Sequence, residues 1–439
     1  MEKIKVAKFG GTSVADANQF RKVKAIVEAD KRRRYVVVSA PGKRHGEDNK
    51  ITDLLYLCHA HIKYSVPFDQ VFDIICDRYV QIVKELDIDL DIKFYLEEIR
   101  SNMTKNISID YLVSRGEYLN ALIMAKFLNY DFIDAKEVIY FDNNGAVDIK
   151  RTEEVMSKVL ANHDYAVIPG FYGSSPDGKI KIFSRGGSDI TGALIARVSD
   201  ADIYENWTDV SGFLMADPRI VDNPKPIERI TYRELRELSY MGASVLHEDA
   251  IFPVRDVGIP INIRNTNDSD NPGTIITSEV SKDSSNKIIT GIAGKKDFTV
   301  ISIYKNHMNS EIGFVRKILS IMEMNDITFE HIPSGIDSVS IVISDSQLDG
   351  KLNIITDEIN KKCHPDSLNV YTNMALIATV GNNMAYTPGI SAKLFTALGN
   401  EGINIRMIDQ GSSEINIIVG VEDKDFKNAI KAIYNAFVV

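Results

Sequence analysis

Cysteine and proline are both scarce in this chain of 439 residues. Its 3 cysteines, Cys58, Cys76 and Cys363, are an odd number, lie far apart and form no CxxC pair, so they indicate no disulfide framework. With 13 prolines and 27 glycines, the chain is not collagenous, of low complexity or largely disordered. Reduced thiols are typical of the cytoplasm, and we expect the protein there.

Long apolar runs and a net positive charge are also missing. No uncharged apolar run reaches the roughly eighteen residues that a membrane span needs. Lys8 interrupts the N-terminal stretch where a secretory signal would be apolar. The 51 basic and 61 acidic residues give a net charge of −10, which is unfavourable for binding nucleic acid or an anionic membrane. We therefore expect neither as a partner.

The residues that are present are those of a soluble globular protein, with 44% hydrophobic and 26% charged side chains. At roughly 150 residues per domain, the chain has two to four domains and can bury a substantial core. Up to residue 290, short apolar runs such as Ile4–Phe9 and Tyr35–Ala40 alternate with helical patterns such as Ala15–Asp30. This alternation predicts an α/β domain with a mainly parallel sheet.

Parallel sheets of this kind bind ligands outside the carboxyl ends of their strands. We therefore expect the chemistry in the loops that follow Phe9, Ala40, Ile168, Phe183 and Trp207. Residues 44–110 carry few sheet signals and are predicted to form a long helical insertion. His59 and His61 fall within it, but side chains two residues apart on a helix diverge, so we expect no metal site there.

The C-terminal part repeats itself. Gly313–Val342 aligns without a gap to Gly389–Ile418 at an offset of 76 residues. Each copy has a helical pattern after a glycine, then a strand, a glycine turn and a strand of alternating apolar and polar residues. A period of this length, present twice, indicates two copies of a small α+β module. The polar segment Lys282–Asn286 is the expected linker before them.

Two glycine-rich segments follow predicted strands. Lys8–Ser13 (KFGGTS) lies where the first strand meets the first helix, and its glycines allow a close approach to an anion at a helix N-terminus. Ser184–Thr191 (SRGGSDIT) opens another helix, with Arg185 as a planar cation and Ser188 or Asp189 as the expected helix cap. Together they favour a two-anion site over two ordinary structural turns.

Other segments give weaker signals. Gly173–Ile180 matches GxxxxGK but has isoleucine where a P-loop needs Ser or Thr, and its Pro-Asp-Gly predicts a hairpin turn. No GxGxxG is present, so a Rossmann dinucleotide site is not supported. Polar residues after the strand that ends at Trp207 suggest ligand contacts. Ser114–Glu117 is predicted to begin an apolar helix, unless Glu117 faces the site and holds a ligand ammonium.

Six motifs in order resemble the aspartate kinase family. They are KFGGTSV at Lys8–Val14, SRGE at Ser114–Glu117, SRGGSD at Ser184–Asp189, WTDVSG at Trp207–Gly212, ADPR at Ala216–Arg219 and GASVLH at Gly242–His247. The C-terminal repeats resemble the paired ACT modules of that family. The likeness implies an amino acid kinase fold, a mainly parallel sheet between helical layers, over residues 1–285. Two α+β ACT modules would follow at 295–370 and 371–439, and whether they interleave strands stays open.

The resemblance also implies a reaction and a set of site residues. The reaction is ATP-dependent phosphorylation of the β-carboxylate of L-aspartate, the first step toward lysine, threonine and methionine. Lys8, Gly10 and Gly11 would bind the ATP phosphates, and Thr208, Asp209 and Arg219 would lie on the nucleotide side. Thr52, Glu117, Arg185, Ser188 and Asp189 would surround aspartate, with Arg185 on a carboxylate and Glu117 on the amino group.

Two positions depart from the family pattern. Ser244 stands where many members have a lysine near the nucleotide, and Leu214 where a tyrosine is common. Both put details of nucleotide binding in question, but not the reaction.

The chemistry agrees with this assignment. A β-carboxylate with a pKa of about 3.9 is ionised at neutral pH and needs no general base to attack the γ-phosphate. The attack of an anion on an anion needs charge neutralisation, which lysine, arginine, Mg²⁺ and backbone N–H groups provide. We expect Lys8 and Asp189 to be catalytic, with Asp189 orienting Lys8 or the substrate ammonium, ATP with Mg²⁺ as cofactor, and no metal held by the protein alone.

The repeats predict regulation. The resemblance implies an L-lysine effector site in the first copy, with threonine as second choice. Its predicted residues are Met308, Glu311, Phe314, Val315, Thr328, Phe329 and Glu330. Glu330 would hold an ammonium, while Met308 and Phe314 would flank an aliphatic chain or simply pack in the core. Assembly through the ACT modules as a homodimer or a dimer of dimers is expected. Because the sequence ends after the second copy, we expect one activity and no homoserine dehydrogenase domain.

Two other functions compete with this one. The chain could be a kinase for glutamate, carbamate or UMP, although the double ACT tail and SRGE argue against that. It could also be an amino-acid sensor built on an inactive kinase domain. Retention of Lys8, Arg185 and Asp189 together argues against an inactive domain.

Overall fold

The computed structural model describes residues 3–243, 252–279 and 288–438. The described chain forms two compact units. The first unit holds residues up to 213 together with 228–232 and 252–279, and the second holds 214–227, 233–243 and 288–438. The predicted linker Lys282–Asn286 and the predicted boundary at residue 285 lie outside the described residues, as does most of the GASVLH motif.

The first unit is built on an eight-stranded sheet with the order β10-β12-β11-β7-β1-β2-β4-β3. Its strands are β1 (Lys5–Phe9), β2 (Arg33–Val38), β3 (Asp131–Phe132), β4 (Ala166–Pro169), β7 (Ile203–Thr208), β10 (Arg229–Thr231), β11 (Ile261–Asn265) and β12 (Thr274–Thr277). All neighbouring pairs are parallel except β11 and β12. The predicted mainly parallel sheet is therefore confirmed, with β1 at its centre.

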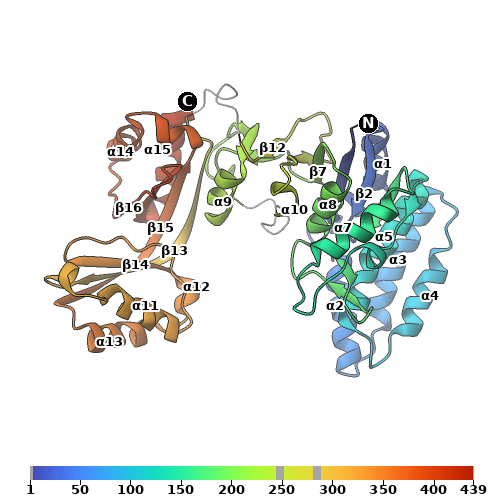
Figure 1. The fold of residues 1–439 in the computed structure, drawn as a ribbon, viewed down its shortest axis with the longest axis horizontal. Coiled ribbons are helices and arrows are strands. Elements are labelled where there is room, and N and C mark those ends of the chain that lie inside the picture. Colours follow the sequence, from blue (N-terminus) through green and yellow to red (C-terminus); the bar gives the residue numbers. More distant parts are fainter. Residues whose placement is uncertain (1–2, 244–251, 280–287, 439) are drawn as a thin grey trace. The chain divides into compact units, whose positions relative to one another are not determined.

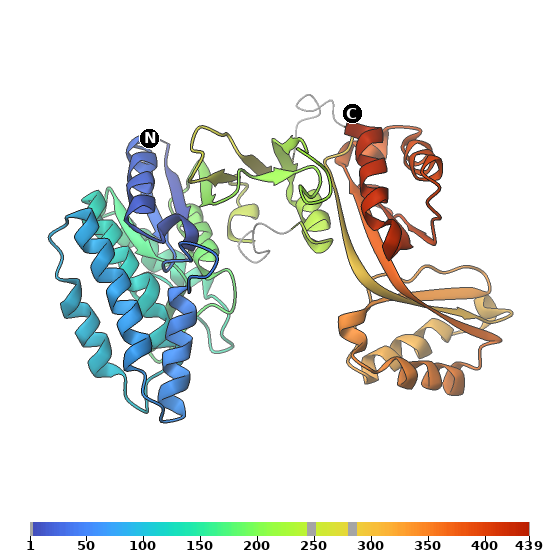
Figure 2. The ribbon, with the colours of Figure 1, turned by 180° about the vertical axis from the view of Figure 1, so that it is seen from behind.

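The sheet alternates with helices, as the apolar periodicity predicts. These are α1 (Ala17–Glu28), α2 (Ile51–Lys63), α3 (Asp69–Leu86), α4 (Ile92–Asn102), α5 (Ile109–Leu128), α6 (Ala135–Val138), α7 (Ile149–Leu160), α8 (Gly187–Val198) and α10 (Phe252–Arg255). The predicted helical insertion is confirmed: α2, α3 and α4 run side by side with α5 (Figures 1 and 2). Their buried faces share one hydrophobic core with β1, β2 and α1.

The GxxxxGK segment is a hairpin, as predicted. Strands β5 (Tyr172–Ser174) and β6 (Ile180–Ile182) pair antiparallel, and Gly178 adopts a φ of +77° in the turn between them. The hairpin forms a sheet of its own beside the eight-stranded sheet.

The second unit contains the two repeats, which share one five-stranded antiparallel sheet. Its order is β14-β13-β15-β17-β16, with β13 (Gly291–Tyr304), β14 (Ser338–Ser344), β15 (Ser367–Val380), β16 (Met407–Asp409) and β17 (Asn416–Glu422). The long strands β13 and β15 pair along their whole length and so belong to both copies (Figure 2). The predicted division between residues 370 and 371 falls inside β15.

The offset of 76 residues recurs in the structure. Helices α11 (Phe314–Met324) and α14 (Ile390–Asn400) are related by it, and each follows a glycine with φ above +80°. Asp297 in β13 and Asn373 in β15 are also 76 apart, and both take a positive φ at an irregularity of the pairing. The prediction of two α+β copies is confirmed down to these backbone details.

The remaining elements of the second unit complete its layers. They are β9 (Pro226–Ile227), which pairs with β8 (Phe213–Leu214), α9 (Tyr232–Tyr240), α12 (Asp345–Leu348), α13 (Leu352–Cys363) and α15 (Phe426–Val438). Helix α13 packs beside α11, and α15 packs beside α14.

A buried charge cluster lies on one face of the first unit's sheet. Glu205 of β7 is fully buried and accepts hydrogen bonds from Arg33 Nε at 2.7 Å, Trp207 Nε1 at 2.9 Å and Lys5 Nζ at 3.2 Å. Burial by itself would raise the pKa of Glu205, but the cations of Arg33 and Lys5 hold that pKa below its ordinary value. The carboxylate therefore joins β7 to β1 and β2.

We expect Glu205→Gln to lower the free energy of unfolding of the first unit by about 3–5 kcal/mol, because Arg33 would stay buried without its counter-ion. Trp207, the only tryptophan in the chain, contacts Glu205 and reports unfolding in urea by its fluorescence. Since the folded pKa is depressed, the difference should be full at pH 7 and shrink as the solution is acidified through that pKa. Glu154→Gln, which removes an exposed pair with Lys158, is the control and should change little. Equal stability of the two variants would contradict the prediction.

Candidate functional site

The carboxyl ends of four parallel strands lie together at one edge of the first unit's sheet. The backbone amide of Gly10 donates to the Trp207 carbonyl at 2.9 Å, which joins the ends of β1 and β7. Ser39 N–H donates to the Phe9 carbonyl at 3.1 Å, and Gly170 N–H donates to the Val38 carbonyl at 3.1 Å. The loops expected to carry the chemistry after β1, β2, β4 and β7 therefore meet.

Glycine is required where the loops after β1 and β2 touch. Gly42 N–H donates to the Gly11 carbonyl at 2.8 Å. A Cβ on Gly42 would lie 2.6 Å from the carbonyl carbon of Gly11, and a Cβ on Gly11 would lie 3.0 Å from the Ala40 carbonyl oxygen. The two backbones can pack together only because neither residue has a side chain.

The glycine segment lies between β1 and α1, as predicted, and the helix begins two residues after the predicted start at Ala15. Gly11–Val14 forms a short 3-10 turn, and α1 begins only at Ala17. The side chain of Asp16 caps α1 by accepting from Gln19 N–H at 3.0 Å. The Asp16 side chain therefore satisfies one of the free N–H groups of α1, and the 3-10 turn presents Gly10 and Gly11 at the edge.

Lys8 is buried, at 7% exposure, and its charge has a defined partner. Its Nζ lies 2.5 Å from Asp189 Oδ1, and a Cβ on Gly10 would lie 3.5 Å from the same nitrogen. Asn206 Nδ2 donates to Asp189 Oδ1 at 2.9 Å, and the Tyr204 hydroxyl donates to the Asp189 carbonyl at 3.0 Å. Asp189 is thus held from β7 and in turn aims the Lys8 ammonium toward the glycine turn.

Helix α8 begins without the side-chain cap that the sequence suggested. Its N-cap is Gly186 in the left-handed region, at φ 60°, and no side chain caps it. Ser188 and Asp189 both lie in the first turn instead, and Asp189 pairs there with Lys8. Ser188 contacts the loop after β4, where a Cβ on Gly170 would lie 2.5 Å from Ser188 Oγ. Arg185 is exposed just before the helix, and no ion pair of the described residues includes it.

Glu117 is a buried acid at this edge whose pKa is strongly raised. The prediction that SRGE begins a helix is wrong: α5 begins at Ile109 with Ser108 as its cap, so Glu117 lies mid-helix. A Cβ on Gly116 would lie 2.9 Å from Ala40 Cβ, so the glycine lets α5 pack close to the loop after β2. Burial raises the pKa of Glu117 to about 8, against the opposing effect of the Ala40 backbone. Among the described residues, Glu117 Oε2 has no hydrogen-bond partner.

The remaining predicted residues of this site are spread more widely. Thr52 is half-buried in the first turn of α2, and Ile51 before it donates to the Pro41 carbonyl at 3.1 Å. Thr208 ends β7, and its hydroxyl donates to the exposed carboxylate of Asp209 at 3.2 Å. Arg219 belongs to the second unit and pairs with Asp217 at 2.7 Å.

The structure describes only one of the two positions that depart from the family pattern. Leu214 belongs to the second unit, and Ser244 lies outside the described residues.

Several residues that shape this edge belong to no predicted site motif. They are Asn206, Gly42 and Gly170, and each lies near the end of a predicted strand. Strand alternation could have identified Asn206, because it faces the opposite side of β7 from the buried Glu205. The contacts of Gly42 and Gly170 could not be inferred, since they arise from loops far apart in sequence.

A magnesium ion would find few protein ligands here. Within residues 3–243, 252–279 and 288–438, no three His, Cys, Asp or Glu side chains are grouped to hold a metal. Mg²⁺ is commonly bound by one or two carboxylates together with substrate phosphates. The exposed Asp209 at the end of β7 suits that mode of binding.

In the second unit, the predicted effector residues divide into a buried and an exposed group. Met308 and Phe314 are buried in the core of the first copy, and Lys305 Nζ lies 5.1 Å from the centre of the Phe314 ring. Glu311 pairs with Lys305 at 2.6 Å and Lys317 at 2.7 Å, and these cations lower its pKa. The burial of Met308 and Phe314 agrees with the alternative that both side chains pack in the core.

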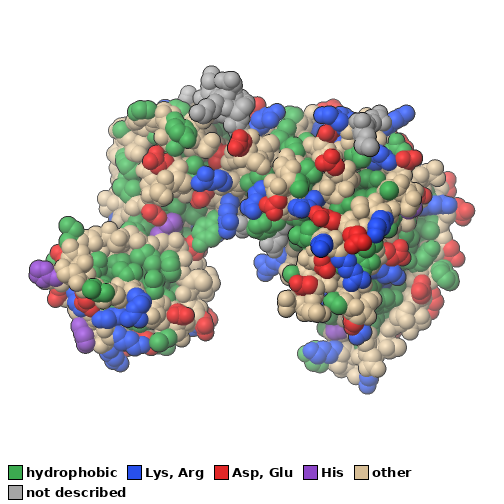
Figure 3. All heavy atoms as spheres, viewed as in Figure 1, with side chains coloured by type: hydrophobic (Ala, Val, Ile, Leu, Met, Phe, Trp, Pro, Cys, Tyr) green, Lys and Arg blue, Asp and Glu red, His purple; other side chains and the backbone are tan. Residues whose placement is uncertain are grey.

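The exposed group offers a surface. Thr328 is exposed, Val315 and Phe329 are 36% and 42% exposed, and Glu330 accepts a hydrogen bond from the Tyr240 hydroxyl. Burial, with this bond, raises the pKa of Tyr240 to about 12. Hydrophobic side chains gather around β14 and α11 in the space-filling view (Figure 3). Ile312, fully exposed, and Ile336, at 72%, add apolar area to this copy.

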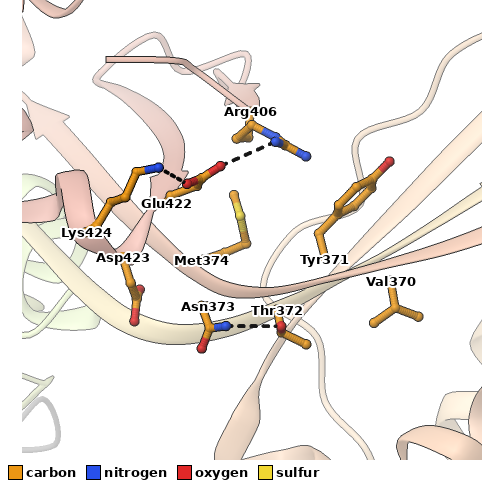
Figure 4. Close-up of a pocket in the computed structure, with 9 residues that line it drawn as sticks. All are labelled: Val370, Tyr371, Thr372, Asn373, Met374, Arg406, Glu422, Asp423 and Lys424. Atoms are coloured by element: carbon orange, nitrogen blue, oxygen red, sulfur yellow. Dashed lines mark hydrogen bonds and ion pairs between the residues drawn. The ribbon is translucent and has the colours of Figure 1, made fainter. Parts of the chain in front are cut away.

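A cavity of about 510 Å³ opens elsewhere in the second unit (Figure 4). Arg406 and Lys424 both point toward Glu422, at 3.6 and 2.7 Å, and Arg406 lies over the Tyr371 ring. None of the predicted effector residues lines this cavity. The repeat could have drawn attention to Arg406, because it stands 76 residues after Glu330.

Described residues include no helix long and apolar enough to span a bilayer.

The fold and the sheet edge define the class of protein first. The sequence profile of the amino acid kinase family matches residues 3–265, and that of the ACT domain matches residues 377–437. A parallel sheet with a buried lysine and glycine turns at its carboxyl edge, followed by ACT copies, therefore defines a kinase of the amino acid kinase class.

Comparison over the full length defines the family. Aspartokinase 3 of Bacillus subtilis (strain 168) is 37% identical over 452 residues, covering 99% of this chain and 98% of the relative. The crystal structure of Clostridium acetobutylicum aspartate kinase is 61% identical, with a TM-score of 0.93 over 99% of this chain and 100% of that one.

Aspartokinase III of E. coli was solved with aspartate and ADP, and also with lysine and aspartate. Both structures are 26% identical to this chain, with TM-scores of 0.74 and 0.75, and cover at least 99% of each chain. The chain belongs to the aspartate kinase family.

Glu117→Gln should change how stability depends on pH. A carboxyl whose pKa is raised by folding binds a proton that the unfolded chain has lost, so stability falls as pH rises between the two values. We expect the free energy of unfolding of the ligand-free wild type to fall between pH 5.5 and 7.5 more steeply than that of the variant, by about 1.4 kcal/mol per pH unit. Urea unfolding followed by Trp207 fluorescence measures this. Glu28→Gln on the exposed face of α1 should keep the wild-type slope, and an unchanged slope in Glu117→Gln would contradict the assignment.

Proposed function

We propose that this enzyme transfers the γ-phosphoryl group of ATP to the β-carboxylate of L-aspartate, giving 4-phospho-L-aspartate. The observation that carries the proposal is the buried Lys8, held by Asp189 and directed at the glycine turn. The family, and the binding of aspartate and ADP by E. coli aspartokinase III, support the same reaction.

On this proposal, the ATP phosphates lie against Lys8, Gly10 and Gly11. Gly10 has no side chain beside the Lys8 ammonium, and a buried ammonium is worth more against phosphate than an exposed one. Thr208 and Asp209 flank the nucleotide from the end of β7. Mg²⁺ accompanies ATP and neutralises phosphate charge, with Asp209 as the neighbouring carboxylate.

Aspartate would be held by charges of opposite sign. The exposed Arg185 guanidinium suits a carboxylate, because its planar donors match the two oxygens. Glu117 suits the ammonium: its orphaned oxygen lacks a donor in the ligand-free protein, and a bound cation would lower its raised pKa and ionise it. Thr52 and Ser188 complete the polar surroundings.

No general base is required in this reaction. The attacking carboxylate is already ionised, so the protein aligns two anions and neutralises their repulsion. Asp189 then acts by orienting the Lys8 ammonium.

Lys8→Met should reduce aspartate-dependent ADP release by at least about 10²-fold, the range for losing one electrostatic contact to a transition state. ADP release from Mg-ATP with L-aspartate measures it, and thermal melting should show a folded protein. Lys158→Met removes an exposed lysine on α7 and is the control, with wild-type turnover expected. Normal turnover in Lys8→Met would refute the phosphate site. Absent turnover in the wild type, with a lysine-dependent rise in melting temperature, would instead favour the amino-acid sensor.

We also propose that L-lysine inhibits the enzyme through the first repeat, with threonine as the second choice. Support comes from the lysine complex of E. coli aspartokinase III and from the exposed group of predicted residues. Glu330 is a better ammonium acceptor than Glu311, because Lys305 and Lys317 already neutralise Glu311. The exposed apolar side chains of this copy favour assembly through the ACT modules, as a homodimer or a dimer of dimers. A cytoplasmic location remains part of the proposal.

Glu330→Gln should raise the L-lysine concentration for half-inhibition about tenfold, which corresponds to losing one charge-assisted contact. Turnover without lysine should stay at the wild-type level. Titration of ADP release with L-lysine, and separately with L-threonine, measures both effects. Glu358→Gln on α13 serves as control, since its half-buried carboxylate pairs only with Lys362 of the same helix among the described ion pairs. Unchanged lysine sensitivity in Glu330→Gln would remove this residue from the effector site.

A further inference from the structure

The loop between β2 and α2 connects the two halves of the proposed active site. At its start, Gly42 packs on Gly11 of the phosphate turn, with its N–H donating to the Gly11 carbonyl at 2.8 Å. At its end lies Thr52, in the first turn of α2. The segment between them has no regular secondary structure of its own, so side-chain contacts must hold its conformation.

Asp48 anchors this loop from within. Between residues 43 and 50 it alone is buried, at 9% exposure. Its carboxylate accepts from Arg78 Nη2 with both oxygens, at 2.7 and 2.8 Å, and from Arg44 Nε at 2.9 Å. The Arg44 backbone N–H donates to it as well, at 2.9 Å. Although burial opposes ionisation, these donors hold the pKa of Asp48 far below its usual range, so the carboxylate is charged at neutral pH.

Arg78 reaches the same loop at a second point. It lies on α3, is 3% exposed, and donates from Nη1 to the Gly42 carbonyl at 3.2 Å. One guanidinium therefore holds both Asp48 and the residue that contacts Gly11. Burial lowers the pKa of Arg78, so the ion pair with Asp48 is what compensates its desolvation.

We propose that Asp48 and Arg78 are positioning residues of this kinase: together they set the Gly11–Gly42 contact on the nucleotide side and the start of α2 on the substrate side. The inference rests on the proposed function for its substrates. Neither residue belongs to the motifs that carry the family resemblance, and neither is placed in contact with a ligand. Their effect is transmitted through backbone groups of the loop.

The test compares Asp48→Asn, Arg78→Gln and the double variant. Steady-state kinetics are measured with Mg-ATP and L-aspartate each varied, and Mg-ADP binding is measured by calorimetry. We expect each single variant to lower kcat/KM for both substrates about tenfold and to weaken the binding of ADP about tenfold. These losses are in the range of coupling within one buried network. Because the two residues act as one unit, the double variant should lose no more than either single variant. Asp48→Glu should recover part of the loss.

The control is another arginine of the same helical insertion, which also pairs with carboxylates. Arg100 of α4 pairs with Asp69 and Asp73 of α3 on the exposed surface. Arg100→Gln should leave kcat, both KM values and ADP affinity unchanged.

Three outcomes decide the inference. A fall in melting temperature with wild-type KM values and ADP affinity would overturn it, because the pair would then be purely structural. Additive losses in the double variant would overturn it as well. If the wild type shows no turnover with aspartate, the proposed function fails. Weaker ADP binding in Asp48→Asn would then still support the positioning role, and unchanged ADP binding would refute it.

Discussion

A buried lysine at the carboxyl end of the central strand needs a counter-charge, and the first unit is organised to provide it. Asp189 comes from the first turn of α8, more than 180 residues along the chain, and meets Lys8 at 2.5 Å. Asn206 of the neighbouring strand donates to the same carboxylate oxygen. The pair therefore requires that β1, β7 and α8 be in place together. An unpaired ammonium at that depth would cost several kcal/mol, so the site and the fold depend on the same contact.

Close backbone packing is the second constraint on this edge. Three contacts leave no room for a Cβ on a glycine: Gly42 against Gly11, Gly170 against Ser188 and Gly116 against Ala40. Such contacts pull separate loops into one surface without filling it with side chains. On the proposed function, the phosphates of ATP lie at that surface, and Lys8, Arg185 and Glu117 supply the charges around it.

The second unit follows a different principle. Its two copies do not form separate sheets: β13 and β15 are long enough to serve both. Each long strand changes from one copy to the other at a residue with positive φ, Asp297 or Asn373, which lets it bend there. Neither copy has a complete sheet alone, so the pair folds as one layer covered by helices.

The parallel α/β class, the helical insertion and the duplicated module can be predicted before folding, because apolar periodicity and a repeat are local or directly visible patterns. The glycine-rich segments at strand ends are visible in the same way. Three features follow only from the folded chain: Ser188 and Asp189 leave the helix cap unused, Glu117 lies mid-helix with an orphaned oxygen, and Asp48 lies buried in an otherwise exposed loop. Those outcomes depend on which side chain is nearest in space. They arise from contacts with residues elsewhere in the chain, namely Lys8, Ala40 against Gly116, and Arg78, so no local pattern contains them.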